Sequence, residues 1–318
     1  MFLSPTNMTT GMSVTSANKT PGAAGFLLDQ FPGADVAFSL RRLRTGYGGP
    51  ILRLRRSADD EEADVHFDAR MGFSLDSPVD NFSSGSNATN LGEFCDSSGY
   101  DDPDSIATSS AFVKTWYDQS GNGRNATQST TSYQPRAIYN GALSYAAAAS
   151  EGKDQGTPAL YLSQDPMDVA QWGTIAHPNS ISIVGADTSA GSGGNKYWWE
   201  STTSGTRNIV GGFFNNDDSG LYSGGSDYLL ITDSNKIAGN KIYFGVWNGT
   251  RSVFLLDGVE AAGTTGDNDQ YGARLFARYS GTSNSMSGYV NEVVWWPTDQ
   301  RPVSGATSDA LNQFYNRF

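Results

Sequence analysis

Short apolar runs with a two-residue period recur along this chain, and they predict β strands. PILRLRRS (50–57) alternates Leu with Arg, which is the pattern of a strand with one buried face. DVHFD (64–68) begins a further strand after the acidic turn ADDEEAD (58–64), and AFVKTWYD (111–118) has the apolar and aromatic content of a central strand. The first half is therefore expected to hold several short strands.

The second half repeats this pattern at short spacing. Turns rich in Gly, Asn and Asp separate its strand-like runs, as in a β sandwich. The runs are SISIVGAD (180–187), KYWWEST (196–202), NIVGGFFN (208–215), YLLITD (228–233), KIYFGVWNG (241–249), SVFLLDGVEA (252–261), ARLFARYS (273–280) and SGYVNEVVWW (287–296). We predict an all-β protein, a two-sheet β sandwich with a few short helices.

Three segments favour short helices. A helix of about ten residues is expected after Pro32, where it would bury part of an apolar set. That set is Phe31, Val36, Phe38, Leu40 and Leu43. Further helices are expected in NATNLGEFC (87–95) and in ATSDALNQFYNRF (306–318). Their inward residues are Leu91, Phe94 and Cys95 in the first, and Leu311, Phe314, Tyr315 and Phe318 in the second.

The N-terminal residues show neither a helical nor a strand period. Residues 1–25 are rich in Thr, Ser, Gly and Asn with scattered Met, so we interpret them as an extended arm that precedes a single sandwich domain at 26–318. Two interpretations of the arm stay open: a disordered terminus, or a segment that becomes ordered against a partner subunit.

Composition narrows the class of protein. A net charge of −12 and a pI near 4.5 argue against a nucleic-acid binder, because phosphate contacts need a basic surface. The single cysteine, Cys95, allows no intramolecular disulfide and is expected to be buried. The sequence shows no signal peptide and no apolar run long enough for membrane insertion, so we expect synthesis in a cytoplasm.

The stretch TWYDQSGNGRNATQ (115–128) is the most distinctive in the chain. Its glycines can adopt positive φ in a turn, and Asp118 can accept hydrogen bonds from the turn amides. Asp118 could instead be a metal ligand or an acid, but we favour the structural role. The residues of this structural loop are Trp116, Tyr117, Asp118, Gln119, Gly121, Asn122 and Gly123.

Two clusters of charged residues are candidates for ion binding. The arginines of the first half could form an anion site, although compensation by the acidic residues at 59–62 is the better interpretation. These arginines are Arg41, Arg42, Arg44, Arg53, Arg55 and Arg56. The acidic groups NNDD (215–218) and DNDQ (267–270) offer oxygens for Ca²⁺ but lack EF-hand spacing, and the two histidines give no zinc signature. We therefore predict no metal site and no cofactor.

Tryptophans are dense in the second half and are candidates for sugar stacking. Aromatic rings at a surface suit the apolar faces of sugars, although core packing is expected to account for most of these residues. The candidates for glycan contact are Trp198, Trp199 and Trp247.

The first half resembles a known family. AFSLRRLRTGYGGPILRLRRSADDEEADVHFD (37–68), LGEFC (91–95) and FVKTWYDQSGNGRNATQSTTSYQPRAIYNGAL (112–143) resemble the N-terminal half of the catalytic domain of the arabinofuranosidase B family of glycoside hydrolases. The resemblance covers roughly residues 28–145 and implies a concanavalin-like jelly-roll sandwich. The run at 287–296 also resembles the closing strand of laminin-G-like sandwiches.

The chain departs from the family where the chemistry should be. It has no Asp-x-Glu-Asn-Gly motif, which holds the family's nucleophile, and Cys95 stands alone, whereas the family uses two adjacent cysteines. Retaining glycosidases need a paired acid and nucleophile. Glu200 and Glu292 are set among aromatic residues, but neither matches the family's motif. We therefore assign no catalytic residue.

The resemblance also implies a context, because such domains occur in head and tail proteins of bacteriophages. We predict a virion structural protein, a head decoration, head-fibre or tail-fibre component. It would be made in the host cytoplasm and would bind other virion proteins through its arm, as a homo-oligomer with a possible host glycan as ligand. The alternative is an α-L-arabinofuranosidase.

Overall fold

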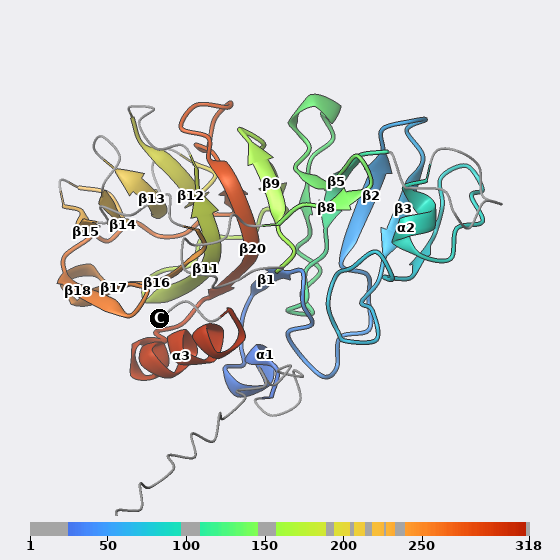
Figure 1. Ribbon diagram of the computed structural model, residues 1–318. Helices are drawn as coiled ribbons and strands as arrows, with labels where there is room; N and C mark the ends of the chain where they lie inside the picture. Colours follow the sequence, from blue (N-terminus) through green and yellow to red (C-terminus); the bar gives the residue numbers. More distant parts are fainter. Residues whose placement is uncertain are drawn as a thin grey trace, which may run out of the picture.

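Antiparallel strands make up most of the regular structure in the computed structural model (Figure 1). It describes residues 25–96, 109–145, 157–188, 194–203, 207–213, 218–225, 227–232 and 239–315. The helices in these ranges are α1 (Leu27–Gln30), α2 (Leu91–Phe94) and α3 (Ser304–Tyr315), with 3-10 turns η1 (Thr131–Tyr133), η2 (Gly249–Arg251) and η3 (Arg301–Val303). The predicted all-β class with a few short helices is confirmed. The predicted arm, apart from Gly25, and Phe318 lie outside the described residues.

One end of the sheet is formed by the first half of the chain. Its strands follow the order β4–β3–β2–β5. They are β2 (Leu52–Arg56), β3 (Glu62–Val65), β4 (Val79–Asp80) and β5 (Ala111–Trp116). On the side of β5 that faces away from β2, two different strands pair with its two ends. Strand β7 pairs with Ala111 and Phe112, and β6 pairs with Thr115 and Trp116. The sheet therefore divides into two layers at β5.

The first layer runs in the order β7–β9–β20–β11–β16–β17–β18. These strands are β7 (Arg136–Tyr139), β9 (Leu160–Ser163), β11 (Asn179–Asp187), β16 (Lys241–Trp247), β17 (Ser252–Leu256), β18 (Val259–Gly263) and β20 (Ser287–Trp296). The short strand β8 (Ala142–Leu143) pairs with β7, and β1 (Val36–Ser39) lies beside the second half of β20. Strands near both ends of the chain thus pair with each other.

The second layer runs in the order β6–β10–β19–β12–β13–β14–β15. These strands are β6 (Ala126–Thr127), β10 (Met167–Val169), β12 (Lys196–Glu200), β13 (Ile209–Phe213), β14 (Asp218–Tyr222), β15 (Leu229–Thr232) and β19 (Ala273–Leu275). At its far end β15 lies next to β17 and β18 of the first layer. The sheet therefore nearly closes on itself, with the main apolar core inside.

A second apolar cluster covers the outer face of the first layer. Figure 1 shows α1 and α3 on this side, beneath β20 and β16. Leu28 and Leu43 from the N-terminal segment pack there with Leu311 and Tyr315 of α3. The short helix at 87–95 and the helix near the C-terminus are confirmed, with Leu91, Phe94, Cys95, Leu311 and Tyr315 buried, whereas Phe314 is exposed.

The helix predicted after Pro32 is wrong. Helix α1 precedes Pro32, and the residues after it form the strand β1, whose four residues are all buried. Gly33 has a φ of 86°, which breaks a helix at this point. Pairing with β20 satisfies the backbone of β1 and buries it, so tertiary contacts outweigh the local helical spacing.

Candidate functional site

The loop at 115–128 is held by its own side chains. Asp118 is buried and its carboxylate accepts hydrogen bonds from the amide nitrogens of Ser120 at 2.8 Å, Arg124 at 3.0 Å and Ala37 at 2.9 Å. The Ser120 hydroxyl also donates to it at 2.7 Å. A carboxylate with this many donors has no lone pair left for a substrate or a metal ion.

Neighbouring loop residues bind the start of the first layer. Gln119 is fully buried, accepts from the amide of Leu43 at 2.9 Å and donates to the carbonyl of Ser39 at 2.9 Å. Asn122 donates to the carbonyl of Asp35 at 3.1 Å. The loop therefore fastens β5 to the segment around β1.

The remaining loop residues also have structural contacts. Gly121 and Gly123 have φ values of 99° and 70°, so both turn positions need the left-handed region. Trp116 is buried in the core beside Phe38, with 5.6 Å between the ring centroids. The Tyr117 hydroxyl donates to Asp64 at 2.7 Å.

The tryptophans predicted to contact glycan lie in the core. Trp198, Trp199 and Trp247 are 1%, 0% and 0% exposed. The Trp199 indole donates to Gln270 at 3.3 Å, and the Trp247 indole donates to the carbonyl of Tyr222 at 3.1 Å. A sugar needs an open ring face, so these residues are not a glycan surface in this structure. Trp198 and Trp199 both reach the same core, although they are consecutive, because a β-bulge interrupts the alternation of β12 between Tyr197 and Trp199.

The two glutamates set among aromatic residues are both buried against arginine. Glu292 contacts Arg41 at 2.7 Å and accepts from the hydroxyl of Tyr315 at 3.0 Å. Glu200 contacts Arg207 at 2.5 Å. Burial raises the pKa of Glu200, while the Arg207 guanidinium acts to lower it. Both carboxylates thus have structural partners.

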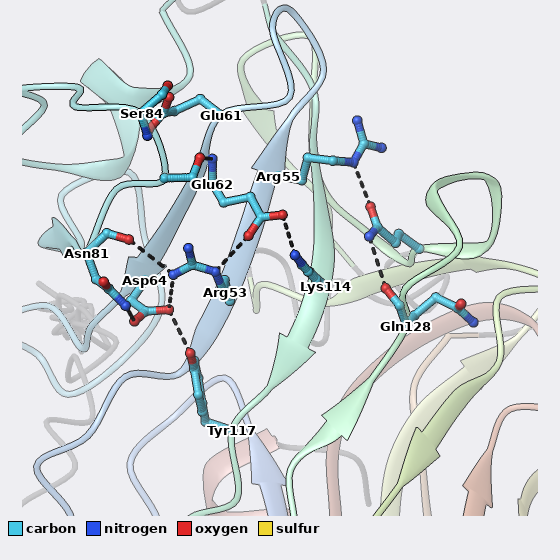
Figure 2. Close-up of polar contacts among 12 residues, drawn as sticks. Arg53, Arg55, Glu61, Glu62, Asp64, Asn81, Ser84, Lys114, Tyr117 and Gln128 are labelled. Atoms are coloured by element: carbon cyan, nitrogen blue, oxygen red, sulfur yellow. Dashed lines mark hydrogen bonds and ion pairs between the residues drawn. The ribbon is translucent and has the colours of Figure 1, made fainter.

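Figure 2 shows a network of charged side chains on the outer face of β2, β3 and β5. Arg53 contacts Glu62 at 2.9 Å and Asp64 at 3.1 Å, and Lys114 contacts Glu62 at 2.5 Å. Burial acts to raise the pKa of Glu62, but the hydrogen bonds from Lys114 and Arg53 bring it below its usual value. The network is therefore neutralised by its own ion pairs.

Other arginines of this region are also neutralised by nearby carboxylates. Arg55 pairs with Asp60 at 2.6 Å, and Arg56 pairs with Asp59 at 2.6 Å. Arg41 is neutralised by Glu292 instead. Charge compensation, rather than an anion site, therefore describes most of the arginine cluster.

A second feature of the same face was not foreseen from the sequence: a row of aromatic and arginine side chains that crosses five strands. Direct cross-strand partners place the row on one face of the sheet. In order across β2, β5, β7, β9 and β20, the partners are Arg55, Phe112, Arg136, Tyr161 and Tyr289. We call this set, together with Tyr139, the aromatic row.

Ring contacts hold the row together. The guanidinium of Arg136 lies 4.5 Å from the ring centroid of Tyr161 and 4.3 Å from that of Tyr139, so it stacks against both rings. The rings of Tyr161 and Tyr289 have centroids 5.3 Å apart. Arg55 lies 5.2 Å from the ring centroid of Phe112.

The row is accessible to solvent. Tyr139 is 54% exposed, and the five residues that cross the strands are half-buried. Sequence patterns offer little sign of this set, because its members come from strands far apart in the chain and meet only through strand register. The one usable signal is the alternation within β9, whose Leu160 and Leu162 point inward and leave Tyr161 outward.

An acidic side chain influences Arg136 of this row. Asp165 is 6% exposed and accepts from the amide of Ser163 at 2.7 Å. Burial raises the pKa of Asp165 to about 6, while the amide hydrogen bond and the charge of Arg136 act to lower it. Asp165 is thus close enough to Arg136 for their charges to interact.

Neither a cluster of metal-binding side chains nor a membrane-spanning helix is found in the part of the chain that the structure describes. No group of three or more His, Cys, Asp or Glu side chains there is placed to hold a metal ion. Among the same residues, no helix combines the length and apolar character needed to cross a bilayer.

Comparison with known proteins shows the fold. No family model matches the chain, and no curated protein matches it. A mutant GH54 α-L-arabinofuranosidase soaked with 4-nitrophenyl α-L-arabinofuranoside is 13% identical with a TM-score of 0.57, over 90% of this chain and 64% of that one. This chain therefore shares a β fold with that enzyme structure.

Two further structures have lower similarity in fold. An arabinofuranosidase complexed with arabinofuranosyl-α-1,2-xylobiose is 16% identical with a TM-score of 0.45, over 89% of this chain and 64% of that one. Domain 4 of AbnA, a GH43 extracellular arabinanase from Geobacillus stearothermophilus, in complex with arabinotriose, is 14% identical with a TM-score of 0.39, over 61% of this chain and 91% of that one. This chain spans 64% of the length of the GH54 enzyme structures.

Proposed function

We propose that this protein is a carbohydrate-binding β domain and that the aromatic row is its sugar-binding surface. The observation that carries the proposal is the alignment of Tyr161, Tyr289 and Tyr139 around Arg136 on an open sheet face. Tyrosine rings present an apolar face and a polar hydroxyl, which match the alternating CH and OH groups of a sugar. A row across neighbouring strands suits an extended oligosaccharide better than a single residue.

The fold supports this proposal. The two layers that divide at β5 are compatible with a concanavalin-like jelly roll, which we retain as the finer description of the topology. The GH54 structure of similar fold was soaked with an arabinofuranoside, which supports a sugar as the class of ligand that we propose. The aromatic row supplies a site that the fold alone does not.

The proposal is tested by glycan binding and one substitution. The full chain is applied to an array of plant, bacterial and animal oligosaccharides, and positive ligands are titrated by calorimetry. Tyr161→Ala removes the central ring, and we expect it to weaken binding at least about tenfold, which corresponds to about 1.4 kcal/mol. The unfolding temperature should change little, because Tyr161 is half-buried.

A matched control lies on the second layer. Tyr228 packs against Tyr222 with 4.7 Å between ring centroids, so Tyr228→Ala removes a ring from a similar tyrosine pair elsewhere. Glycan affinity should survive this change. A blank array, or equal affinities for wild type and Tyr161→Ala, would refute the proposed site.

The virion role stays a proposal beside this one. In a head or tail component that binds host glycans, the aromatic row would face the host and the arm would contact the virion. The arm, apart from Gly25, lies outside the described residues. Deletion of residues 1–25 should leave the unfolding temperature unchanged and abolish incorporation into particles. Normal incorporation of the truncated chain would remove the arm from the mechanism.

The enzymatic alternative is tested separately. An α-L-arabinofuranosidase needs a nucleophile and an acid on opposite sides of the scissile bond. Glu200 and Glu292 are engaged by arginine, so neither is set up as a free nucleophile. Turnover of a chromogenic arabinofuranoside that Glu200→Gln or Glu292→Gln abolishes would establish the alternative.

A further inference from the structure

Arg136 differs from other arginines of this sheet in having no acidic partner. Within the described residues its side chain makes no hydrogen bond and no ion pair, and its Nε is buried without an acceptor. On β2, two strands away, Arg53 and Arg55 both form ion pairs with carboxylates. An unpaired guanidinium in the middle of an aromatic row is therefore an exception to the charge compensation of this sheet.

The geometry of Arg136 is suited to receive an anion. Tyr139 and Tyr161 stack on it at 4.3 Å and 4.5 Å, which limits the rotamers it can adopt. An arginine that is already held in place loses less entropy when it binds, and its planar donors match a carboxylate in two parallel hydrogen bonds. The tyrosines thus prepare the guanidinium for a ligand.

The carboxyl of Asp165, although near Arg136, is not its ion-pair partner. Asp165 is committed to the amide of Ser163 at 2.7 Å, and these two described residues, Asp165 and Arg136, form no ion pair with each other. The donors of Arg136 therefore remain available to a ligand that lies on Tyr161.

We propose, on the basis of the sugar-binding role inferred above, that the aromatic row selects carboxylated glycans and that Arg136 binds the carboxylate. The ligand class is an oligosaccharide that contains a uronic or sialic acid. Its sugar ring stacks on Tyr161, and its carboxylate meets the guanidinium beside that ring. The net charge of −12 repels anions at long range, so the selectivity is local to this arginine rather than a property of the surface field.

The test uses pairs of ligands that differ in charge. Calorimetry on the full chain compares tetragalacturonate with its methyl ester and sialyllactose with lactose, and an array of neutral and carboxylated glycans extends the comparison. We expect at least one carboxylated ligand to bind about tenfold or more tightly than its neutral counterpart. Arg136→Gln should bring the two affinities within about twofold, and Arg136→Lys should retain part of the difference.

Arg278 provides the matched control. It also stacks on a tyrosine, 5.2 Å from the ring centroid of Tyr279, and its Nε also lacks an acceptor. Arg278→Gln should leave the preference for the carboxylated ligand unchanged. Circular dichroism and the unfolding temperature establish that both variants are folded.

The possible results distinguish selectivity from sugar binding itself. Binding of neutral and charged ligands with equal affinity, lost in Tyr161→Ala, would overturn the selectivity and leave the sugar-binding role intact. A preference for carboxylated ligands that persists in Arg136→Gln would likewise overturn the assignment of Arg136. Absence of binding to every glycan would overturn both.

Discussion

The loop at 115–128 and the aromatic row both include residues of β5, but their polar groups are satisfied to opposite degrees. In the loop, the carboxylate of Asp118 has four donors, all from the protein itself. In the row, Arg136 has no hydrogen-bond partner among the described residues, and Tyr139 is 54% exposed. In the more conspicuous sequence motif the hydrogen bonds of the carboxylate are thus complete, and the binding role that we propose lies with the groups left unsatisfied.

The largest expected effect concerns the core. Trp199 stacks on Trp295 with 6.0 Å between ring centroids and is fully buried, so Trp199→Ala leaves a large cavity. We expect a loss of about 4 kcal/mol in the free energy of unfolding. Urea denaturation measures this change. A stable variant that has lost only glycan affinity would restore Trp199 as a candidate sugar contact.

The next effect tests the loop. Asp118→Ala removes the acceptor for three backbone amides, and we expect it to cost about 3 kcal/mol in the free energy of unfolding. Asp118→Asn keeps one oxygen acceptor and should cost less. Glycan affinity, measured where both variants are folded, should be unchanged. If Asp118→Ala were as stable as wild type, the loop would not be the structural element that its contacts indicate.

A smaller effect depends on pH. Asp165 has a folded-state pKa of about 6, above its ordinary value of 3.8, so the folded protein binds this proton more tightly than the unfolded chain does. The stability contributed by this group is therefore fully present below about pH 4 and is lost as the pH rises through about 6.

Asp165→Asn should abolish that dependence. We expect the variant to be more stable than wild type by about 1 to 2 kcal/mol at pH 7.5, and to match it at about pH 3.5. Thermal unfolding of both proteins across this range measures the difference. A variant that is less stable than wild type at pH 7.5 would mean that the Asp165 carboxylate is stabilised by its surroundings rather than penalised by burial.

The smallest expected effect distinguishes the two loop glycines. Gly123 has a φ of 70° with open space where a Cβ would lie, so Gly123→Ala should cost only the backbone strain of about 1 kcal/mol. At Gly121 a Cβ would also lie 2.8 Å from Nη2 of Arg44, so Gly121→Ala should cost more. Equal stabilities of the two variants would show that Arg44 moves away freely.

The class of fold could be predicted from the sequence better than the position of a site. Turn residues and two-residue periods identify the strands because each strand encodes its own buried face. The same rule could not predict β1, because its helical spacing is overridden by pairing with β20, in which Ser39 meets Glu292 across 253 residues of chain. It also could not tell which way Trp198 and Trp199 point, since a β-bulge in β12 shifts the alternation between Tyr197 and Trp199.

The aromatic row could not be predicted from local sequence patterns. Phe112, Arg136, Tyr161 and Tyr289 become neighbours only through the register of four strands. A single sequence contains the alternation of each strand but not its partner. Arg136 could be noticed from sequence only as one arginine among many, and its lack of a carboxylate partner is visible only in three dimensions.

The pairing of β1 with β20 also determines the order of events during synthesis. Residues 36–39 are synthesised about 250 residues before their hydrogen-bonding partners at 292–295. Glu292 joins Arg41 to Tyr315 of α3 in the same way. The first layer therefore cannot close on the nascent chain until residues 292–295 have been synthesised, and the protein is expected to fold slowly for its size and to need protection of its early strands until then.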